Sequence, residues 1–104
     1  MANRGPRVYL EELRKAVFDS DGVTSRDLRR QAADGKDLPP ELAPVIDKIR
    51  KHAYKVTPED IEALKKAGRS EDEIFELTCA AAVGVSIHRC ERALATLEGK
   101  GDKS

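Results

Sequence analysis

The sequence predicts an all-α protein with about five helices, formed by one domain that covers the 104 residues. Apolar residues recur every three or four positions, as they do on one face of a helix. Residues that favour helix N-caps precede these stretches, and glycines follow several of them. No alternation of apolar and polar residues indicates a strand. We expect residues 1–6 and 99–104 to be flexible ends.

The first predicted helix covers about residues 8–18. Leu10, Leu13 and Val17 lie on one side of it and form an apolar stripe. The polar run at residues 19–22 combines aspartates, a serine and a glycine, which favour a turn. The second helix is therefore predicted to begin after this turn, with Thr24 as its N-cap.

The second helix carries two further signals at its start. Asp27 follows Thr24 by three residues, as the acid of a capping box does. Val23 and Leu28 occupy the two positions of a hydrophobic staple. The helix is expected to end near residues 34–35, where an aspartate precedes a glycine.

Prolines mark the start of the next two helices, because proline is tolerated in the first turn. Residues 39–40 open the third helix, and Thr57 with Pro58 opens the fourth, which Gly68 ends. The apolar face of the third helix comprises Leu42, Val45, Ile46 and Ile49. A fifth and longest helix is expected from the capping box at residues 70–73 to about Leu97.

Composition restricts the possible functions. Charged residues make up 37% of the chain and cancel to zero net charge, which gives no general reason to expect nucleic acid as a partner. The arginines of the second helix lie among acids and without aromatic residues, which also disfavours nucleic-acid binding. Large apolar residues are few, so burying a helix face against a second copy would help to offset chain entropy. We therefore predict a homo-oligomer.

The sequence shows no signal peptide, and its longest mostly apolar run, residues 77–87, is too short to span a bilayer. Two cysteines do not make a disulfide framework. These observations predict a cytoplasmic protein with reduced thiols and no membrane partner.

The cysteines and one histidine lie close together in the sequence of the last helix. Cys79 and Cys90 are eleven residues apart, which places them on one side but about 16 Å apart along the axis, too far for a disulfide. His88 points to the opposite side, so it forms neither a metal site nor a Cys–His nucleophile with them. We expect no metal and no cofactor. Cysteine also packs as a small hydrophobe, so we interpret this part of the chain as a buried or interface helix.

The small residues of that helix support the same interpretation. The alanines at residues 80–82, together with Gly84, leave room for another backbone to approach closely. A helix that is apolar on nearly all sides is expected to be surrounded by protein. A reactive thiol at Cys79 or Cys90 is the less favoured alternative.

Residues 56–89 resemble part of the alkylhydroperoxidase-like superfamily, which includes the carboxymuconolactone decarboxylases. Members of this superfamily often begin a helix with a motif of seven residues. Its order is glycine, any residue, serine or threonine, an acid, any residue, glutamate and isoleucine. The matching residues here are Gly68, Ser70, Glu71, Asp72, Glu73 and Ile74, continued by Phe75, Glu76, Leu77, Ala81 and Ala82. The resemblance implies an all-helical, oligomeric fold.

The redox branch of that superfamily implies a Cys-x-x-Cys pair, with a histidine four residues beyond it and an upstream glutamate. A low-pKa thiolate, a resolving thiol and a proton relay would follow from that motif. This chain has no cysteine at the positions that the motif requires. If His52 were the motif's histidine, those positions would hold Val45 and Lys48; if His88 were, they would hold Ala81 and Gly84. The disulfide peroxidase mechanism is therefore not supported.

Two hypotheses remain. The favoured one is a non-catalytic or diverged alkylhydroperoxidase-like protein that self-associates through its alanine-rich last helix, as an accessory or partner-binding subunit. The other is a decarboxylase-like or hydroperoxidase-like enzyme with a diverged site, whose weak candidates are His52, Glu76, His88 and Cys79. Glu76 would then be a buried acid paired with Arg89, His52 or Lys48. Convergence of His52 and Glu76 in one pocket would favour the enzyme.

Overall fold

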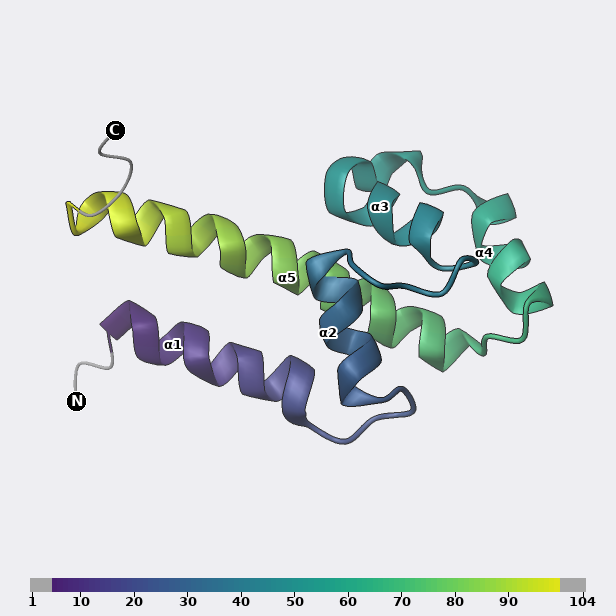
Figure 1. Ribbon diagram of the computed structural model, residues 1–104, viewed down its shortest axis with the longest axis horizontal. Coiled ribbons are helices and arrows are strands. Elements are labelled where there is room, and N and C mark those ends of the chain that lie inside the picture. The colour runs from purple at the N-terminus through teal and green to yellow at the C-terminus, as the bar shows by residue number, and fades with distance from the viewer. Residues whose placement is uncertain (1–4, 100–104) are drawn as a thin grey trace.

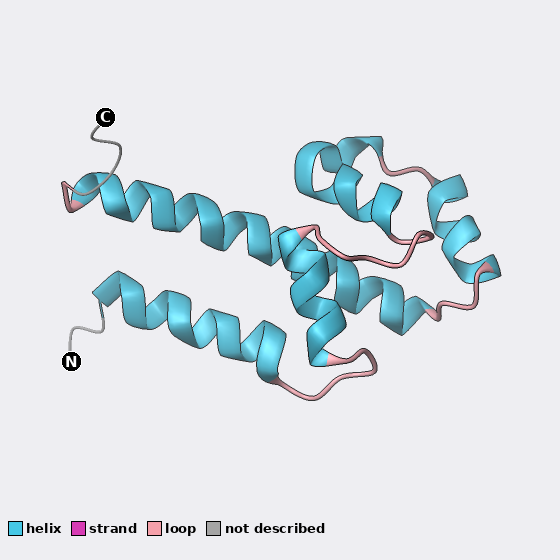
Figure 2. Ribbon diagram, viewed as in Figure 1, coloured by secondary structure: helices cyan, strands magenta, loops and turns pink. Residues whose placement is uncertain are grey.

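The computed structural model describes residues 5–99, and these residues form an all-helical structure (Figures 1 and 2). Helices account for 77% of it, and the described residues contain five α-helices and no strand. The predicted all-α class is therefore confirmed. The expected flexible ends, residues 1–6 and 99–104, lie mostly outside the described residues. Over residues 5–99, no helix has the length and apolar character needed to cross a membrane.

Helix α1 spans Gly5–Arg14 and continues into a π-helical turn, η1, at Lys15–Asp19. The predicted apolar stripe is confirmed, because Leu10 is buried and Leu13 and Val17 pack against the core. Phe18 adds a buried ring to the same side at the end of η1. This stripe attaches α1 to the rest of the molecule.

Helix α2 spans Arg26–Asp34 and begins one residue later than predicted. Ser25 is its N-cap, and the Ser25 hydroxyl accepts a hydrogen bond from the Leu28 amide at 3.0 Å. The predicted hydrophobic staple is wrong, because Val23 lies two residues before the Ser25 cap instead of one, and its side chain is 57% exposed. Gly35 ends the helix in the left-handed conformation, with φ of 68°, as predicted.

Helix α3 spans Ala43–His52 and begins three residues after the proline pair that was expected to open it. The Pro39 carbonyl accepts hydrogen bonds from the amides of Leu42 and Ala43, at 3.0 and 3.1 Å, and these form a separate turn before the helix. A short 3₁₀ turn, η2, follows at Ala53–Lys55.

Helix α4 spans Pro58–Lys66, and its start confirms the prediction. Thr57 caps it in a complete capping box with Asp60, and Pro58 is the first helical residue. Gly68 follows with φ of 102°, and the next residue, Arg69, returns a hydrogen bond to the Leu64 carbonyl. Proline and threonine at the start and glycine at the end thus fix both boundaries.

Helix α5 spans Glu71–Leu97 without interruption, and the predicted capping box of Ser70 and Glu73 is present. Its 27 residues extend for about 40 Å, most of the 47 Å length of the molecule. Helices α2, α3 and α4 gather around its first half, whereas α1 runs antiparallel beside its second half (Figure 1). We call α1 with residues 86–97 the arm.

The core lies where α2 crosses α5. Ala32 on α2 and Ala80 and Ala81 on α5 are fully buried. A Cβ atom added to Gly84 would lie 2.7 Å from the Cβ and the carbonyl oxygen of Ala33, so the two backbones touch at this point. The expected close approach at the small residues of α5 therefore occurs within the chain, against α2.

Candidate functional site

The four weak catalytic candidates lie apart in the structure. His52 is the exposed last residue of α3, and its ring meets Tyr54 edge-on at 5.8 Å between centroids. His88 is exposed on the arm, and Cys79 is partly buried on the other side of α5. Across residues 5–99, no three His, Cys, Asp or Glu side chains gather in the way a metal site requires.

Glu76 has a different role from the predicted one. Its carboxylate accepts hydrogen bonds from the Val23 amide at 2.9 Å and from the amide and hydroxyl of Thr24 at 2.9 and 2.7 Å. The Thr24 hydroxyl, together with the two amides, holds the pKa of Glu76 below its usual value. The expected pairing with Arg89, His52 or Lys48 is thus wrong, and Glu76 anchors the loop that precedes α2.

The loop passes so close to Glu76 that its sequence is restricted. A Cβ atom on Gly22 would lie 2.7 to 2.9 Å from the atoms of the Glu76 carboxyl group. Glycine therefore lets the loop backbone reach the carboxylate. The sequence analysis did not assign this role, because residues 22 and 76 are neighbours only in three dimensions.

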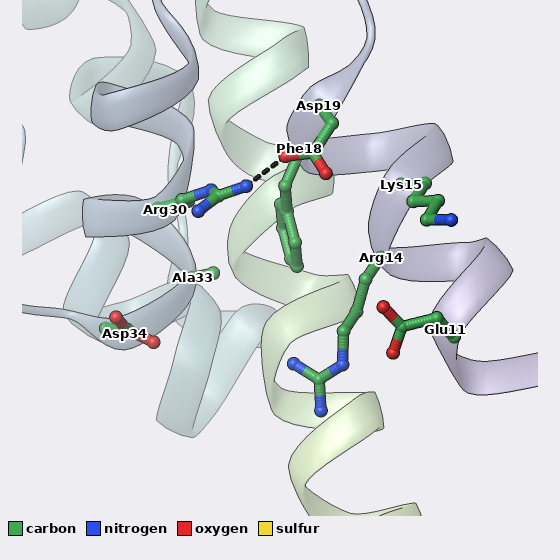
Figure 3. Close-up of a pocket in the computed structure, with 8 residues that line it drawn as sticks. All are labelled: Glu11, Arg14, Lys15, Phe18, Asp19, Arg30, Ala33 and Asp34. Carbon is green, nitrogen blue, oxygen red and sulfur yellow. Dashed lines mark hydrogen bonds and ion pairs between the residues drawn. The ribbon is translucent and has the colours of Figure 1, made fainter. Parts of the chain in front are cut away.

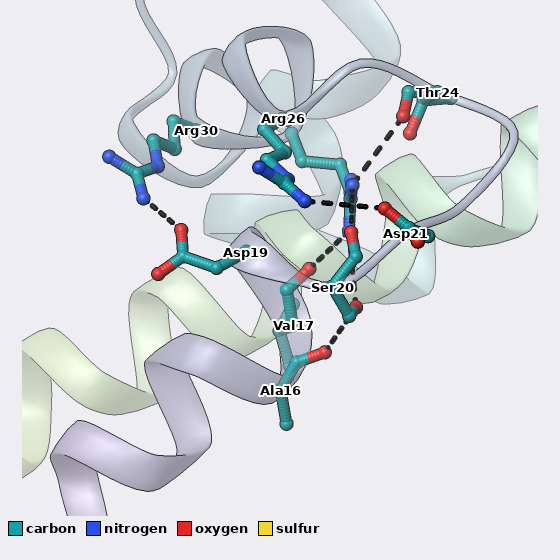
Figure 4. Close-up of polar contacts among 9 residues, drawn as sticks. Ala16, Val17, Asp19, Ser20, Asp21, Thr24, Arg26 and Arg30 are labelled. Carbon is teal, nitrogen blue, oxygen red and sulfur yellow. Dashed lines mark hydrogen bonds and ion pairs between the residues drawn. The ribbon is translucent and has the colours of Figure 1, made fainter.

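Arg29 holds the same loop from the opposite side. It is only 4% exposed, and its guanidinium donates to the carbonyls of Val17 at 2.7 Å and Ser20 at 2.6 Å. The neighbouring arginines also bind within the chain, Arg26 to Asp21 and Arg30 to Asp19 (Figure 4). Arg29 thus fixes the α1–α2 connection from the interior, whereas Arg26 and Arg30 remain exposed and pair with acids of that connection.

A cavity of about 260 Å³ lies at the joint between η1 and α2 (Figure 3). Phe18 closes it on the inside, while acids and bases alternate around its edge. Arg30 is paired with Asp19, and Arg14 is paired with Glu91 of α5. Two of the three lining cations are engaged in this way and only Lys15 is left, so the cavity offers no convergent set of groups for a charged ligand.

The most distinctive surface of the molecule is one face of α5 that the chain leaves uncovered. Phe75 near its start is 68% exposed, and Leu97 at its end is 83% exposed. Small residues join them on the same side of the helix, within about 80° of arc. We define the α5 face as Phe75, Cys79, Ala82, Ser86, Cys90, Ala93 and Leu97.

The α5 face corrects one expectation about the cysteines. Cys90 is exposed, rather than packed in an interior, and Cys79 is only partly covered. Leu94 turns away from the face and is 8% exposed. No charged residue lies within the face between its two ends, so an uncharged strip about 33 Å long, with Ser86 at its centre and Arg89 at its border, is open to another molecule.

A groove borders the α5 face in the arm, between α1 and the end of α5. Tyr9 of α1, which is 70% exposed, and Leu10 form one wall, and the last two turns of α5 form the other. The groove measures about 250 Å³ and is lined by Tyr9, Leu10, Cys90, Ala93, Leu94 and Leu97. Because all these side chains are apolar or nearly so, the groove suits an apolar side chain from a partner.

Comparisons of the chain with protein-family models, with curated proteins and with solved structures found no match. The α5 face and its groove are therefore identified as the candidate site from their geometry alone. Its signal in the sequence is the recurrence of uncharged residues every three or four positions from Phe75 to Leu97. That signal identifies a face of the helix, and the three-dimensional structure identifies the side that the chain itself leaves open.

Proposed function

We propose that this chain is a non-catalytic helical protein of the alkylhydroperoxidase-like type that self-associates through α5 and serves in the cytoplasm as an accessory or partner-binding subunit. The observation that carries the proposal is the α5 face, an uncharged strip with an exposed large apolar residue at each end. The catalytic alternative has no comparable support, because its candidate residues do not converge.

Burial of the α5 face supplies the driving force. Covering a phenylalanine or leucine side chain contributes roughly 1.5 to 3 kcal/mol, and both Phe75 and Leu97 are more than two-thirds exposed. The small residues between them allow another helix to approach closely, as Ala33 approaches Gly84 inside the chain. The face therefore combines apolar anchors with a flat surface that fits a helix.

The arm adds a second reason for association. In the second half of α5, Leu94 and Ile87 are buried toward α1 and η1, while Ser86, Cys90 and Ala93 on the α5 face are exposed. Two helices alone bury too little surface to be stable in isolation. A partner along the α5 face would complete the arm as a bundle.

Sedimentation velocity across the micromolar range tests the proposal. We expect the wild-type chain to shift from monomer to dimer as its concentration rises. Ser86→Glu puts a charge in the middle of the α5 face and should keep the chain monomeric. Ala63→Glu, on the exposed side of α4, is the matched control and should leave association unchanged. A wild-type chain that stays monomeric throughout would contradict the proposal.

A further inference from the structure

We infer that two copies of this chain pack antiparallel along their α5 faces about a two-fold axis at Ser86, with Phe75 of each copy against Leu97 of the other. The inference rests on the proposed self-association and adds its orientation and register. It also names Phe75 and Leu97 as the residues whose burial dominates the interface.

The order of residues on the α5 face is symmetric about Ser86. Ala82 and Cys90 lie four residues to either side, Cys79 and Ala93 seven, and Phe75 and Leu97 eleven. Large side chains thus lie at both ends and small ones lie between them. A two-fold axis at Ser86 sets large opposite large and small opposite small, as an interface between identical surfaces requires.

The shape of the chain favours the antiparallel orientation over the parallel one. Helices α2, α3 and α4 surround the first half of α5, whereas only α1 accompanies the second half (Figure 1). Antiparallel packing places the thick half of each copy beside the thin arm of the other. Parallel packing would instead bring the two thick halves together along one side.

Charge favours the same orientation. The first turn of α5 contains three acids at the positive end of the helix dipole. Glu71 pairs with Lys65 at 2.7 Å, and Glu73 lies 4.0 Å from Arg69, so the charge of Asp72 is the one outside these ion pairs. A parallel pair would bring two such acidic turns together, and like charges in contact repel. An antiparallel pair separates them by about 40 Å, because the acidic turn lies 13 to 15 residues from the two-fold axis.

In the antiparallel register, Phe75 of one copy lies beside the groove in the arm of the other copy. The register places Phe75 of one copy level with Leu97 of the other, at the edge of the groove that Tyr9 and Ala93 line. The Phe75 ring of each copy therefore lies at the apolar groove of the other, and the two-fold axis produces this contact twice. A strip one helix wide lies at the lower end of stable interface sizes, so we expect a dimer that dissociates in the micromolar range.

Disulfide trapping of an introduced cysteine tests the register. Ser86→Cys is made in a chain whose native thiols are removed by Cys79→Ala and Cys90→Ala. Copper(II)–phenanthroline takes two electrons from two facing thiols, which lose two protons and form one disulfide. We expect rapid formation of a covalent dimer, because the two residues at position 86 meet at the axis, within the Cα separation of about 7 Å that a disulfide allows.

Phe75→Cys in the same background is the matched orientation control. It should not cross-link to itself, since the antiparallel register holds the two copies of residue 75 about 33 Å apart. Mixed with a Leu97→Cys chain, it should give a covalent heterodimer. Circular dichroism of the reduced variants, compared with the parent chain, checks that each of them folds.

The outcomes separate the register from the proposed function. A sedimenting dimer whose Ser86→Cys variant does not cross-link would overturn the register and leave self-association standing. Self-cross-linking of Phe75→Cys as fast as that of Ser86→Cys would show a parallel pair, and would overturn the orientation. A chain that is monomeric at every concentration would overturn both.

Discussion

The two halves of α5 contain similar small residues and use them in opposite ways. In the first half, Ala80 and Ala81 are fully buried, because α2 and α3 lie against them. In the second half, Ser86, Cys90 and Ala93 are exposed. The comparison shows that a run of small residues marks a place for close approach, but does not tell whether the approaching helix belongs to the same chain.

The two halves also differ in how firmly the rest of the chain holds them. The first half is enclosed by three helices and by the loop that Glu76 anchors. The second half is held by α1 and η1, through a short apolar stripe and ion pairs such as Arg14 with Glu91. We therefore expect the arm to open locally at lower free energy than the core does.

Truncating one leucine in each half of α5 should give the largest difference in stability between two variants. Leu77 is 1% exposed in the first half, and Leu97 is 83% exposed at the end of the arm. We expect Leu77→Ala to lower the free energy of unfolding by about 2 to 5 kcal/mol, through lost transfer energy and a cavity. Leu97→Ala should change it by less than about 0.5 kcal/mol in the monomer.

Urea denaturation at a concentration where the chain is monomeric measures both effects. Sedimentation then provides the complementary result, because Leu97→Ala should weaken self-association while it leaves the fold intact. Equal losses of stability for the two variants would contradict the distinction between the halves.

The contact between α2 and α5 should be the next most sensitive point. Gly84→Ala places a Cβ atom 2.7 Å from the Ala33 carbonyl oxygen, a backbone atom that cannot move aside without moving α2. Overpacking costs about 1 to 3 kcal/mol, and the gain of about 1 kcal/mol in helix propensity offsets part of it. We expect a net loss of up to about 2 kcal/mol, measured by thermal unfolding.

Ala82→Gly is the reference for that measurement, because residue 82 lies on the exposed side of the same turn. It should lose only the propensity difference of about 1 kcal/mol, with no change in packing. If Gly84→Ala stabilised the protein, the close approach of α2 to α5 would be refuted.

Much of the fold was predictable from local signals. The capping boxes at Thr57 and Ser70 fix helix starts through hydrogen bonds within four residues, and Gly35 and Gly68 end helices through their own backbone conformation. These signals need no knowledge of the rest of the chain. The prediction of where α4 and α5 begin was therefore confirmed.

Several of the errors share one physical origin, which is contact between residues distant in sequence. Thr24 has the chemistry of an N-cap, but its hydroxyl donates to Glu76, fifty-two residues away, and Ser25 caps α2 instead. Arg29 had no predicted role of its own, and its burial against η1 and the loop that follows depends on residues 9 and 12 positions earlier. The sequence likewise identified the apolar stripe of the cysteines but not its exposed side.

The Glu76 anchor should make stability depend on pH. Hydrogen bonds from Thr24 and Val23 favour the carboxylate and hold its pKa below the unfolded value of about 4.3. Its contribution is therefore complete above that unfolded value and is lost as the pH falls through the lower, folded pKa. Glu76→Gln should cost roughly 1 to 2 kcal/mol at neutral pH and flatten the acid limb of the stability profile.

Denaturation from neutral to acidic pH, with Glu62→Gln on exposed α4 as the control, measures this dependence. The control should retain the slope of the wild-type chain. A Glu76→Gln chain with an unchanged slope would show that the loop is held without the carboxylate charge.

The smallest effect should come from the ion pairs of the arm, and it bears directly on how the two halves of α5 differ. Arg7 donates to Glu98 at 2.7 Å, and Arg14 pairs with Glu91, but these side chains are between one-third and two-thirds exposed. Exposed pairs contribute about 0.2 to 1 kcal/mol each and are screened by salt. We expect Arg14→Gln to speed amide exchange in α1 by only about two- to five-fold.

Hydrogen exchange of the monomeric chain at low and high salt measures this change. Exchange in α2 should stay constant, because its amides open only with the core, whereas high salt should bring wild-type α1 close to the Arg14→Gln variant. If α1 and α2 exchanged together in both chains, the arm would unfold only with the core. In that case the second half of α5 would owe its stability to the same packing as the first.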